Sequence, residues 1–223
     1  MVKQERAART REVLVRAAAE VFVEEGFATA SIGAISKRAG VSAGGLHFHF
    51  GSKTALAEAV VDRAAASVRV ITVSRLAGGN ALQVLVDSTH DLMALLAHDP
   101  VVSAGFGLCV ATGTGDAEAV GPCGVRRQWQ RWVEAMFRTA ARNGELADGV
   151  SAQDAAAAVV AAIVGFEALG ADEGAWLAEP SLARYWALML PRIAADGSLG
   201  ELRADGSDAM CVAGAARSGA PDQ

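Results

Sequence analysis

The sequence has few cysteines and no apolar leader. Its 223 residues include three cysteines, Cys109, Cys123 and Cys211, an odd number without a CxxC spacing, so no disulfide framework is predicted. The first residues lack the apolar stretch of a signal peptide. Both absences are typical of a reducing compartment, and we expect a cytoplasmic protein.

The sequence also lacks an apolar run of the length that a membrane helix needs. A spanning helix takes about 20 apolar residues, whereas the run 155–164 is followed by Gly165 and Glu167. We therefore expect no membrane-spanning segment.

The residue patterns of enzymes are missing too. The sequence shows no nucleophile motif, phosphate-binding glycine loop, metal cluster or carboxylate pair. Cys109 and Cys123 have no nearby basic residue or capping motif that would activate them. No catalytic residue, metal or cofactor is predicted. An enzyme acting on a small molecule is the less favoured alternative, which measurable turnover would support.

Positive charge is concentrated at one end of the chain. Residues 1–60 contain eight Lys and Arg against six Asp and Glu, whereas the remaining residues contain twelve against nineteen. The formal net charge is therefore +2 in the first part and −7 in the second. This asymmetry predicts that a polyanion binds to the N-terminal part alone.

The N-terminal part predicts three helices and the start of a fourth. Residues 10–27 form an amphipathic pattern that Gly26 ends, and Ser31 precedes a second helix that ends at Gly40. Ser42 is placed to cap a third helix through its hydroxyl. Two short helices joined by a glycine-containing turn describe a helix-turn-helix.

The third helix contains the stretch AGGLHFHF, residues 43–50. Leu46 and Phe50 are an i, i+4 pair that can share one buried face. An alternating β-strand over the same residues is less favoured. Ser52 starts another helical pattern directly afterwards, which leaves such a strand without a partner.

Beyond residue 75 the sequence is almost entirely helical in pattern. The segments with apolar periodicity are 81–97, 125–142, 152–169 and 181–195. Glycines break residues 99–123 into short pieces, and the Gly, Asp and Ala content of residues 197–223 predicts a flexible tail.

Residues 10–56 resemble the TetR family of bacterial transcriptional regulators. The matching features are the run AAAEVFVEEGFATASI, followed by IGAISKRAGVSAGGLHFHFGSKTAL. The resemblance implies an all-α fold, in which a three-helix DNA-binding domain at 1–56, with its helix-turn-helix at 31–50, precedes a helical ligand-binding and dimerisation domain at 57–196. It also implies a double-stranded DNA operator as partner.

In TetR proteins the short third helix enters the major groove, where bare glycine backbone can approach bases and phosphates. Gly44 and Gly45 could also serve only as flexible turn residues. The resemblance places His47 and Phe48 at positions that reach the DNA, and Lys53 at a phosphate-contacting position. The predicted DNA-binding residues are Ser31, Ser42, Ala43, Gly44, Gly45, His47, Phe48, His49 and Lys53.

The role of His49 is open. It could donate to a phosphate or hydrogen-bond within the turn. A metal site made with His47 is disfavoured, because residues two apart diverge on a helix and no third ligand is near.

A narrower resemblance is to the actinobacterial gamma-butyrolactone receptors and pseudo-receptors, which control antibiotic production and differentiation. It rests on the opening VKQERAARTR, on LHFHF and on ARNGEL at 141–146. Many relatives have lysine in place of Ala43 and tyrosine in place of His47, which puts the base contacts and the operator sequence in doubt. The resemblance implies a repressor released by a small apolar effector, or a pseudo-receptor that answers a furan, butenolide or antibiotic.

The segment 125–142 contains Trp129, Trp132 and Met136 along one helical stripe. Such a stripe can simply fill a core. The resemblance implies instead that one tryptophan of this helix lines a ligand cavity, and its spacing from NGEL favours Trp129. The predicted ligand-binding residues are Trp129, Gln130, Trp132, Met136 and His90.

Small residues in 152–169 and 181–195 permit close helix approach. They predict a two-fold four-helix interface and hence a homodimer. A dimer places its recognition helices about 34 to 36 Å apart on a roughly palindromic operator. A monomer, or an adaptor that binds protein rather than DNA, is the alternative.

Overall fold

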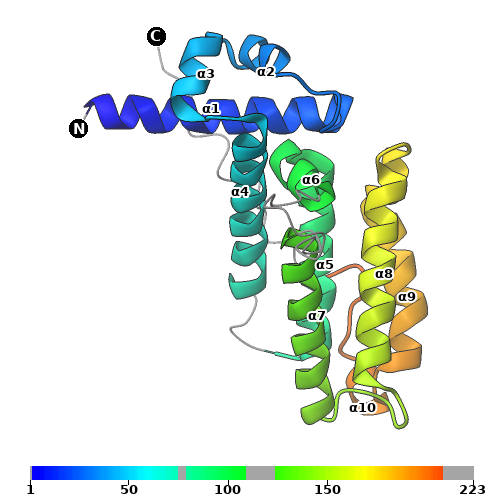
Figure 1. Ribbon diagram of the computed structural model, residues 1–223. Coiled ribbons are helices and arrows are strands. Elements are labelled where there is room, and N and C mark those ends of the chain that lie inside the picture. The colour runs from blue at the N-terminus through cyan, green and yellow to red at the C-terminus, as the bar shows by residue number, and fades with distance from the viewer. Residues whose placement is uncertain (1, 75–78, 109–123, 208–223) are drawn as a thin grey trace, which may run out of the picture. The chain divides into compact units, whose positions relative to one another are not determined.

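The computed structural model describes residues 2–74, 79–108 and 124–207 (Figure 1). The elements in these ranges are α1 (Val2–Glu25), α2 (Ile32–Ala39), α3 (Ala43–His49), α4 (Lys53–Ser74), α5 (Ala81–His98), α6 (Pro100–Gly107), α7 (Gly124–Arg142), α8 (Ala152–Gly170), the 3₁₀ helix η1 (Gly174–Leu177), α9 (Glu179–Ile193) and α10 (Asp196–Leu199). No strand occurs in the described ranges, which contain one isolated bridge between Leu146 and Ala194. The predicted all-α fold is confirmed.

The chain divides into two compact units. The first comprises residues 1–74 and 95–132, and the second comprises residues 75–94 and 133–223. The domain boundary predicted at residue 56 falls inside α4, and it stays a prediction.

In the first unit, α2 and α3 lie on one side of α1, and α4 leads away from the opposite side (Figure 1). Each of the first four helices contributes a completely buried leucine or isoleucine: Leu14, Ile35, Leu46 and Leu56. Burying such a side chain contributes about 1.5 to 3 kcal/mol. The core residues of the helix-turn-helix therefore hold α2 and α3 on α1.

Two features of the first unit differ from the sequence prediction. α1 begins at Val2 rather than at residue 10, because the Lys, Glu, Arg and Ala residues at its start favour a helix without giving it apolar periodicity. α6 lies within a region predicted to be broken into pieces. Asp99 caps it by accepting the N–H of Val101 at 2.9 Å, and Pro100 takes a first-turn position.

α6 packs closely on α4. A Cβ atom at Gly105 would overlap the Cβ of Ala64, so glycine allows the two helices to approach. The remainder of the predicted broken segment, residues 109–123, lies outside the described residues together with Cys109 and Cys123.

The second unit is organised around Trp186 of α9. Its side chain is completely buried, and its indole N–H donates to Thr89 Oγ1 at 2.8 Å. The Glu145 carboxylate accepts the N–H of Leu82 at 3.1 Å and the amide of Asn143 at 2.8 Å. The NGEL motif thus links the end of α7 to the start of α5.

Part of the predicted tail is ordered against α5. The backbone N–H of Ser207 donates to Asp87 Oδ1 at 2.8 Å, and the Ser207 hydroxyl donates to Asp87 Oδ2. Arg203 N–H donates to Gln83 Oε1 at 2.7 Å. Polar side chains on α5 therefore hold residues that the sequence assigns to a flexible tail, because tail composition gives no sign of a partner elsewhere. Residues 208–223 lie outside the described ranges.

Within the described ranges, α8 is the one helix whose length and hydropathy would suit a membrane crossing. Core helices of proteins in water meet the same criterion. Ser151 caps its start by accepting the N–H of Asp154 at 3.2 Å, and Glu167 lies near its other end.

Candidate nucleic-acid interface and ligand-binding helix

The starts of α2 and α3 are capped by serines, and a glycine ends α2 at the turn between them. Ser31 Oγ accepts the N–H of Ala34 at 3.1 Å, and Ser42 Oγ accepts the N–H of Gly45 at 3.1 Å. Gly40 has φ 65°, a left-handed conformation that ends α2 and that L side chains rarely adopt. The helix-turn-helix predicted at 31–50 has this geometry. Ser31 and Ser42 both cap helices, and their predicted contacts with DNA stay predictions.

α3 buries one residue and exposes most of the others. Leu46 is completely buried, whereas Ala43, Gly44 and His47 are exposed. Phe48 is 85% exposed, the largest value among the exposed large apolar side chains. Single exposed apolar side chains are common on protein surfaces, so this exposure shows that the Phe48 ring is accessible to a partner and is not needed for the core.

The two adjacent glycines have different surroundings. A Cβ atom at Gly44 would meet nothing within 4 Å. A Cβ atom at Gly45 would lie 2.9 Å from Val41 Cγ1 and 3.3 Å from Ser42 Oγ. A side chain at Gly45 would therefore crowd Val41, whereas the exposed Gly44 has room for one.

His49 lies half-buried beside Phe48, with their ring centroids 5.3 Å apart in an edge-to-face arrangement. No group of three or more His, Cys, Asp or Glu side chains suitable for a metal occurs among the described residues.

Lys53 has a different environment from the one the resemblance implies. Its ammonium donates to the carbonyl oxygens of Phe27 at 2.8 Å, Ala28 at 3.1 Å and Ala30 at 2.9 Å. It also lies 4.7 Å from the centre of the Phe27 ring. An ammonium has three donors, and all three are used inside the protein.

α2 is tied to α1 by an ion-pair cluster. Arg38 Nη2 lies 2.6 Å from Glu24 Oε2, Nη1 lies 2.9 Å from Glu24 Oε1, and Nη1 lies 3.4 Å from Glu20 Oε2. The hydrogen bonds from the guanidinium lower the pKa of Glu24 and raise that of Arg38. This bidentate pair orients the first helix of the motif, although its exposure to solvent limits its contribution to stability.

The predicted ligand-binding residues Trp129, Trp132 and Gln130 belong to the first unit. Trp129 is completely buried and its ring centre lies 5.0 Å from that of Trp132. Neither indole N–H has a hydrogen-bond partner among the described residues. Gln130 is exposed. The stripe thus contains two buried donors for which the described part of the chain supplies no acceptor, a feature that a core alone does not require.

The other two predicted ligand-binding residues belong to the second unit. Met136 is buried, and the ring Nε2 of His90 lies 3.0 Å from the carbonyl oxygen of Ala204. His90 is therefore engaged by the ordered segment after α10.

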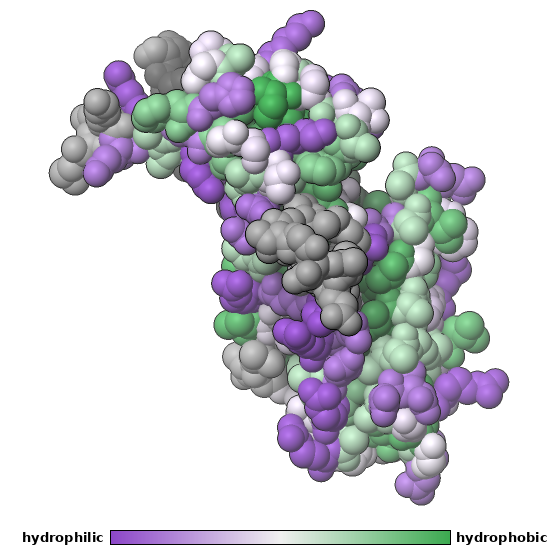
Figure 2. Space-filling view, in the orientation of Figure 1, coloured by the Kyte–Doolittle hydropathy of each residue, from purple (hydrophilic) through white to green (hydrophobic). Residues whose placement is uncertain are grey.

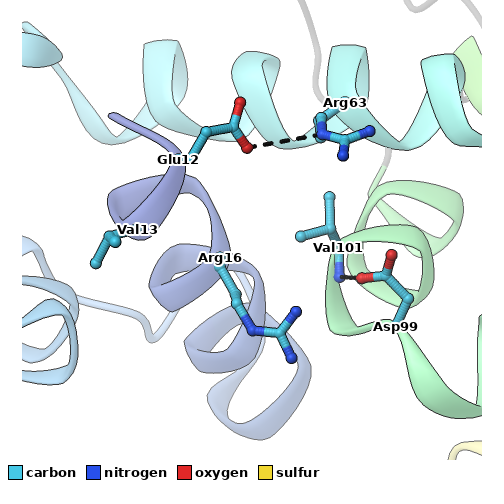
Figure 3. Close-up of a pocket in the computed structure, with 6 residues that line it drawn as sticks. All are labelled: Glu12, Val13, Arg16, Arg63, Asp99 and Val101. Atoms are coloured by element: carbon cyan, nitrogen blue, oxygen red, sulfur yellow. Dashed lines mark hydrogen bonds and ion pairs between the residues drawn. The ribbon is translucent and has the colours of Figure 1, made fainter. Parts of the chain in front are cut away.

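A shallow hollow of about 230 Å³ lies among α1, α4 and α6 (Figure 3). Its lining residues are Glu12, Val13, Arg16, Arg63, Asp99 and Val101. Glu12 faces Arg63 across it at 3.7 Å, and Arg16 pairs with Glu20 at 3.3 Å. The sequence does not predict this hollow, because its residues come from three separate segments. Its charges are balanced within the protein.

Residues 14–60, which span α1 to the first turns of α4, match the family model described as bacterial regulatory proteins, tetR family. The A-factor receptor protein of Streptomyces griseus is 32% identical over 213 residues, which cover 92% of this chain and 71% of that protein. The chain belongs to the TetR family.

Solved TetR-type structures share the fold. The regulator TylP from Streptomyces fradiae is 28% identical, with a TM-score of 0.69 over 89% of this chain and 93% of its own. A gamma-butyrolactone receptor described as ArpA-like is 22% identical, with a TM-score of 0.71 over 88% of this chain and 93% of its own. The chain is accordingly a TetR-type DNA-binding transcriptional regulator related to these receptors.

Proposed function

We propose that this TetR-family regulator is a repressor that binds a near-palindromic operator as a dimer and leaves it when a small apolar effector binds. By its relatives, the effector is of the gamma-butyrolactone class, and the regulated genes serve antibiotic production or differentiation. The observation that carries the DNA-binding part is the exposed face of α3, with Phe48 85% exposed on a helix anchored by the buried Leu46.

The exposed residues of α3 suit the major groove. Gly44 lets the backbone come close to the DNA, and the ring of Phe48 suits apolar contact with a thymine methyl group. His47 is exposed and can donate or accept hydrogen bonds. Ala43 has no polar side-chain group with which to hydrogen-bond a base edge. Readout by this helix therefore rests on His47 and Phe48.

The exposed side of α8 supports the dimer. Its exposed side carries the small residues Ala157, Ala158 and Ala161, and the part of α8 that faces the viewer in Figure 2 is largely apolar. Leu188 of α9 is 71% exposed. Small residues on one helix and an exposed leucine on another are typical of a helix-bundle interface that a second copy covers.

The pair formed by the buried Trp129 and the half-buried Trp132 supports an effector site on α7. An apolar ring with a carbonyl, such as a butyrolactone, offers an acceptor to an indole N–H that has none among the described residues. Because Trp129 is completely buried, a ligand reaches it only when the surrounding helices move. An effector that binds this moved state more tightly shifts the protein towards it, and DNA affinity changes in proportion.

A pseudo-receptor that answers a furan, a butenolide or an antibiotic uses the same fold and the same DNA surface. It differs only in the ligand that releases it.

Selection from a random duplex pool tests the DNA-binding and dimer parts together. The purified protein should enrich a near-palindrome whose half-sites lie about 10 base pairs apart, or a multiple of that spacing. Enrichment of a single half-site would indicate a monomer. A pool without enrichment would contradict the proposal, and binding that does not weaken with salt would point to a protein partner.

A further inference from the structure

We propose that Lys53 is a positioning residue for the helix-turn-helix: its ammonium joins the chain just before the motif to the chain just after it. This inference rests on the proposed DNA-binding function. It replaces the phosphate contact that the TetR resemblance implies for this lysine.

The three acceptors of Lys53 come from one short stretch. Phe27, Ala28 and Ala30 follow the end of α1, and their carbonyl oxygens lie 2.8, 3.1 and 2.9 Å from Nζ. The Phe27 ring covers the ammonium at 4.7 Å. A phosphate could gain a hydrogen bond from Lys53 only if one of these carbonyls lost its own.

Residues 27–30 lead directly into α2, so the contact with Lys53 affects where α2 begins. Ala30 is buried and directly precedes Ser31, whose hydroxyl caps α2. Holding the Ala30 carbonyl therefore holds the start of α2. Lys53 is the first residue of α4 and follows the end of α3 by a few residues. One side chain thus fixes both the entry and the exit of the helix-turn-helix.

Loss of this contact should affect the orientation of α3 more than the stability of the fold. The core residues Leu14, Ile35 and Leu46 keep the helices together. Without Lys53, the carbonyls of Phe27 and Ala30 lose a charged donor in a partly buried place, and the loop can re-arrange to reach water. The angle at which α3 meets the groove then becomes less defined, which weakens base readout more than general attraction to phosphate.

The test compares Lys53→Met and Lys53→Arg with Lys37→Met. Lys37 is an exposed lysine of α2 whose side chain forms no hydrogen bond or ion pair among the described residues, so its variant matches the charge lost in Lys53→Met. Each variant is measured against the operator selected by the wild type and against a random duplex, over a series of salt concentrations.

A positioning role predicts that Lys53→Met weakens operator binding at least about tenfold. It predicts a salt slope equal to that of the wild type, and a loss of affinity for random duplex no larger than that of Lys37→Met. Lys53→Arg keeps the charge, but its planar fork does not direct three donors at converging carbonyls. It should lose operator affinity as well.

A phosphate contact predicts the opposite pattern and would overturn the inference. Lys53→Met would then weaken binding to both DNAs, with a salt slope smaller by about 0.9 than that of the wild type. Lys53→Arg would bind like the wild type.

Amide hydrogen exchange tests the same contact without DNA. Exchange over residues 28–34 should be faster in both Lys53 variants and unchanged in Lys37→Met. Equal exchange in all of them would contradict the positioning role. Failure of the wild type to select any duplex would instead contradict the proposed function, so the two failures are distinguishable.

Discussion

Gly44 and Gly45 are neighbours on α3, but a side chain at Gly45 would lie 2.9 Å from Val41 Cγ1, whereas one at Gly44 would meet nothing within 4 Å. A side chain therefore has room at Gly44 but crowds Val41 at Gly45. We expect substitutions at Gly44 to change DNA binding and substitutions at Gly45 to change folding stability.

Gly44→Leu should leave folding and dimer formation intact and abolish operator binding. Leucine favours the helix over glycine by up to about 1 kcal/mol, so the melting temperature should stay the same or rise. The bulky side chain would hold the backbone away from the groove. Thermal melting and fluorescence anisotropy measure the two effects, and undiminished operator binding would show that this backbone does not approach the DNA.

Gly45→Ala tests the neighbouring glycine, where even a methyl group should be too large. The added methyl group must displace Val41, and such overpacking costs about 1 to 3 kcal/mol. The free energy of unfolding of this variant should therefore fall, and its operator affinity should fall as well because the turn that holds α3 is disturbed. Equal stability of this variant and the wild type would mean that Val41 moves aside without cost.

Phe48→Ala should reduce operator affinity without reducing stability. The ring is 85% exposed, so its removal should change the free energy of unfolding by less than about 0.5 kcal/mol. Loss of the apolar area that the ring buries against DNA should weaken operator binding by up to about 3 kcal/mol. Leu46→Ala is the control, because this buried neighbour should lower stability by about 2 to 5 kcal/mol. Unchanged operator affinity in Phe48→Ala would remove Phe48 from the interface.

Trp129→Phe should weaken the effector response more than DNA affinity. Its indole N–H has no partner among the described residues, so losing it should cost little stability. If the N–H donates to the effector, release of DNA should require about tenfold more effector. Effector titration of the operator complex gives this shift.

Trp186→Phe is the control for that prediction. Its N–H donates to Thr89 Oγ1 at 2.8 Å, so the same substitution there should lower the free energy of unfolding by about 1 kcal/mol or more. If Trp129→Phe destabilises the protein as much and leaves the effector response unchanged, the tryptophan is a core residue only.

Tyr185 should ionise late in an alkaline titration. Burial raises its pKa to about 12, and it is the one tyrosine in the sequence, so tyrosinate absorbance reports on it alone. The unfolded chain holds this proton less tightly, with a pKa of about 10. The stability due to Tyr185 is therefore present below about pH 10 and is lost as the pH rises towards about 12. A tyrosinate midpoint near 10 in the folded protein would contradict this environment.

The sequence predicts the helix-turn-helix well because its signals are local. Ser31, Gly40 and Ser42 act on residues within one turn of themselves, and the structure uses each as predicted. The start of α1 was missed because it lacks apolar periodicity. The role of Lys53 could not be derived either, since its partners lie more than twenty residues earlier in the chain.

The same limit applies to the ligand-binding candidates. Helical spacing places Trp129 and Trp132 on one stripe, and their rings do meet. Helical spacing does not predict that Gln130 is exposed. It also does not predict the contact between His90 Nε2 and the carbonyl oxygen of Ala204, which lies in the segment after α10. Such partners depend on how distant segments fold together.

The most direct measurement of the central claim is fluorescence anisotropy of the labelled, selected operator bound by the protein and titrated with a gamma-butyrolactone. The proposed function predicts saturable release of the DNA, with the effector concentration for release increased in Trp129→Phe. Release by a furan, a butenolide or an antibiotic, but by no butyrolactone, would identify a pseudo-receptor. A complex that none of these ligands releases would contradict control by a small apolar effector.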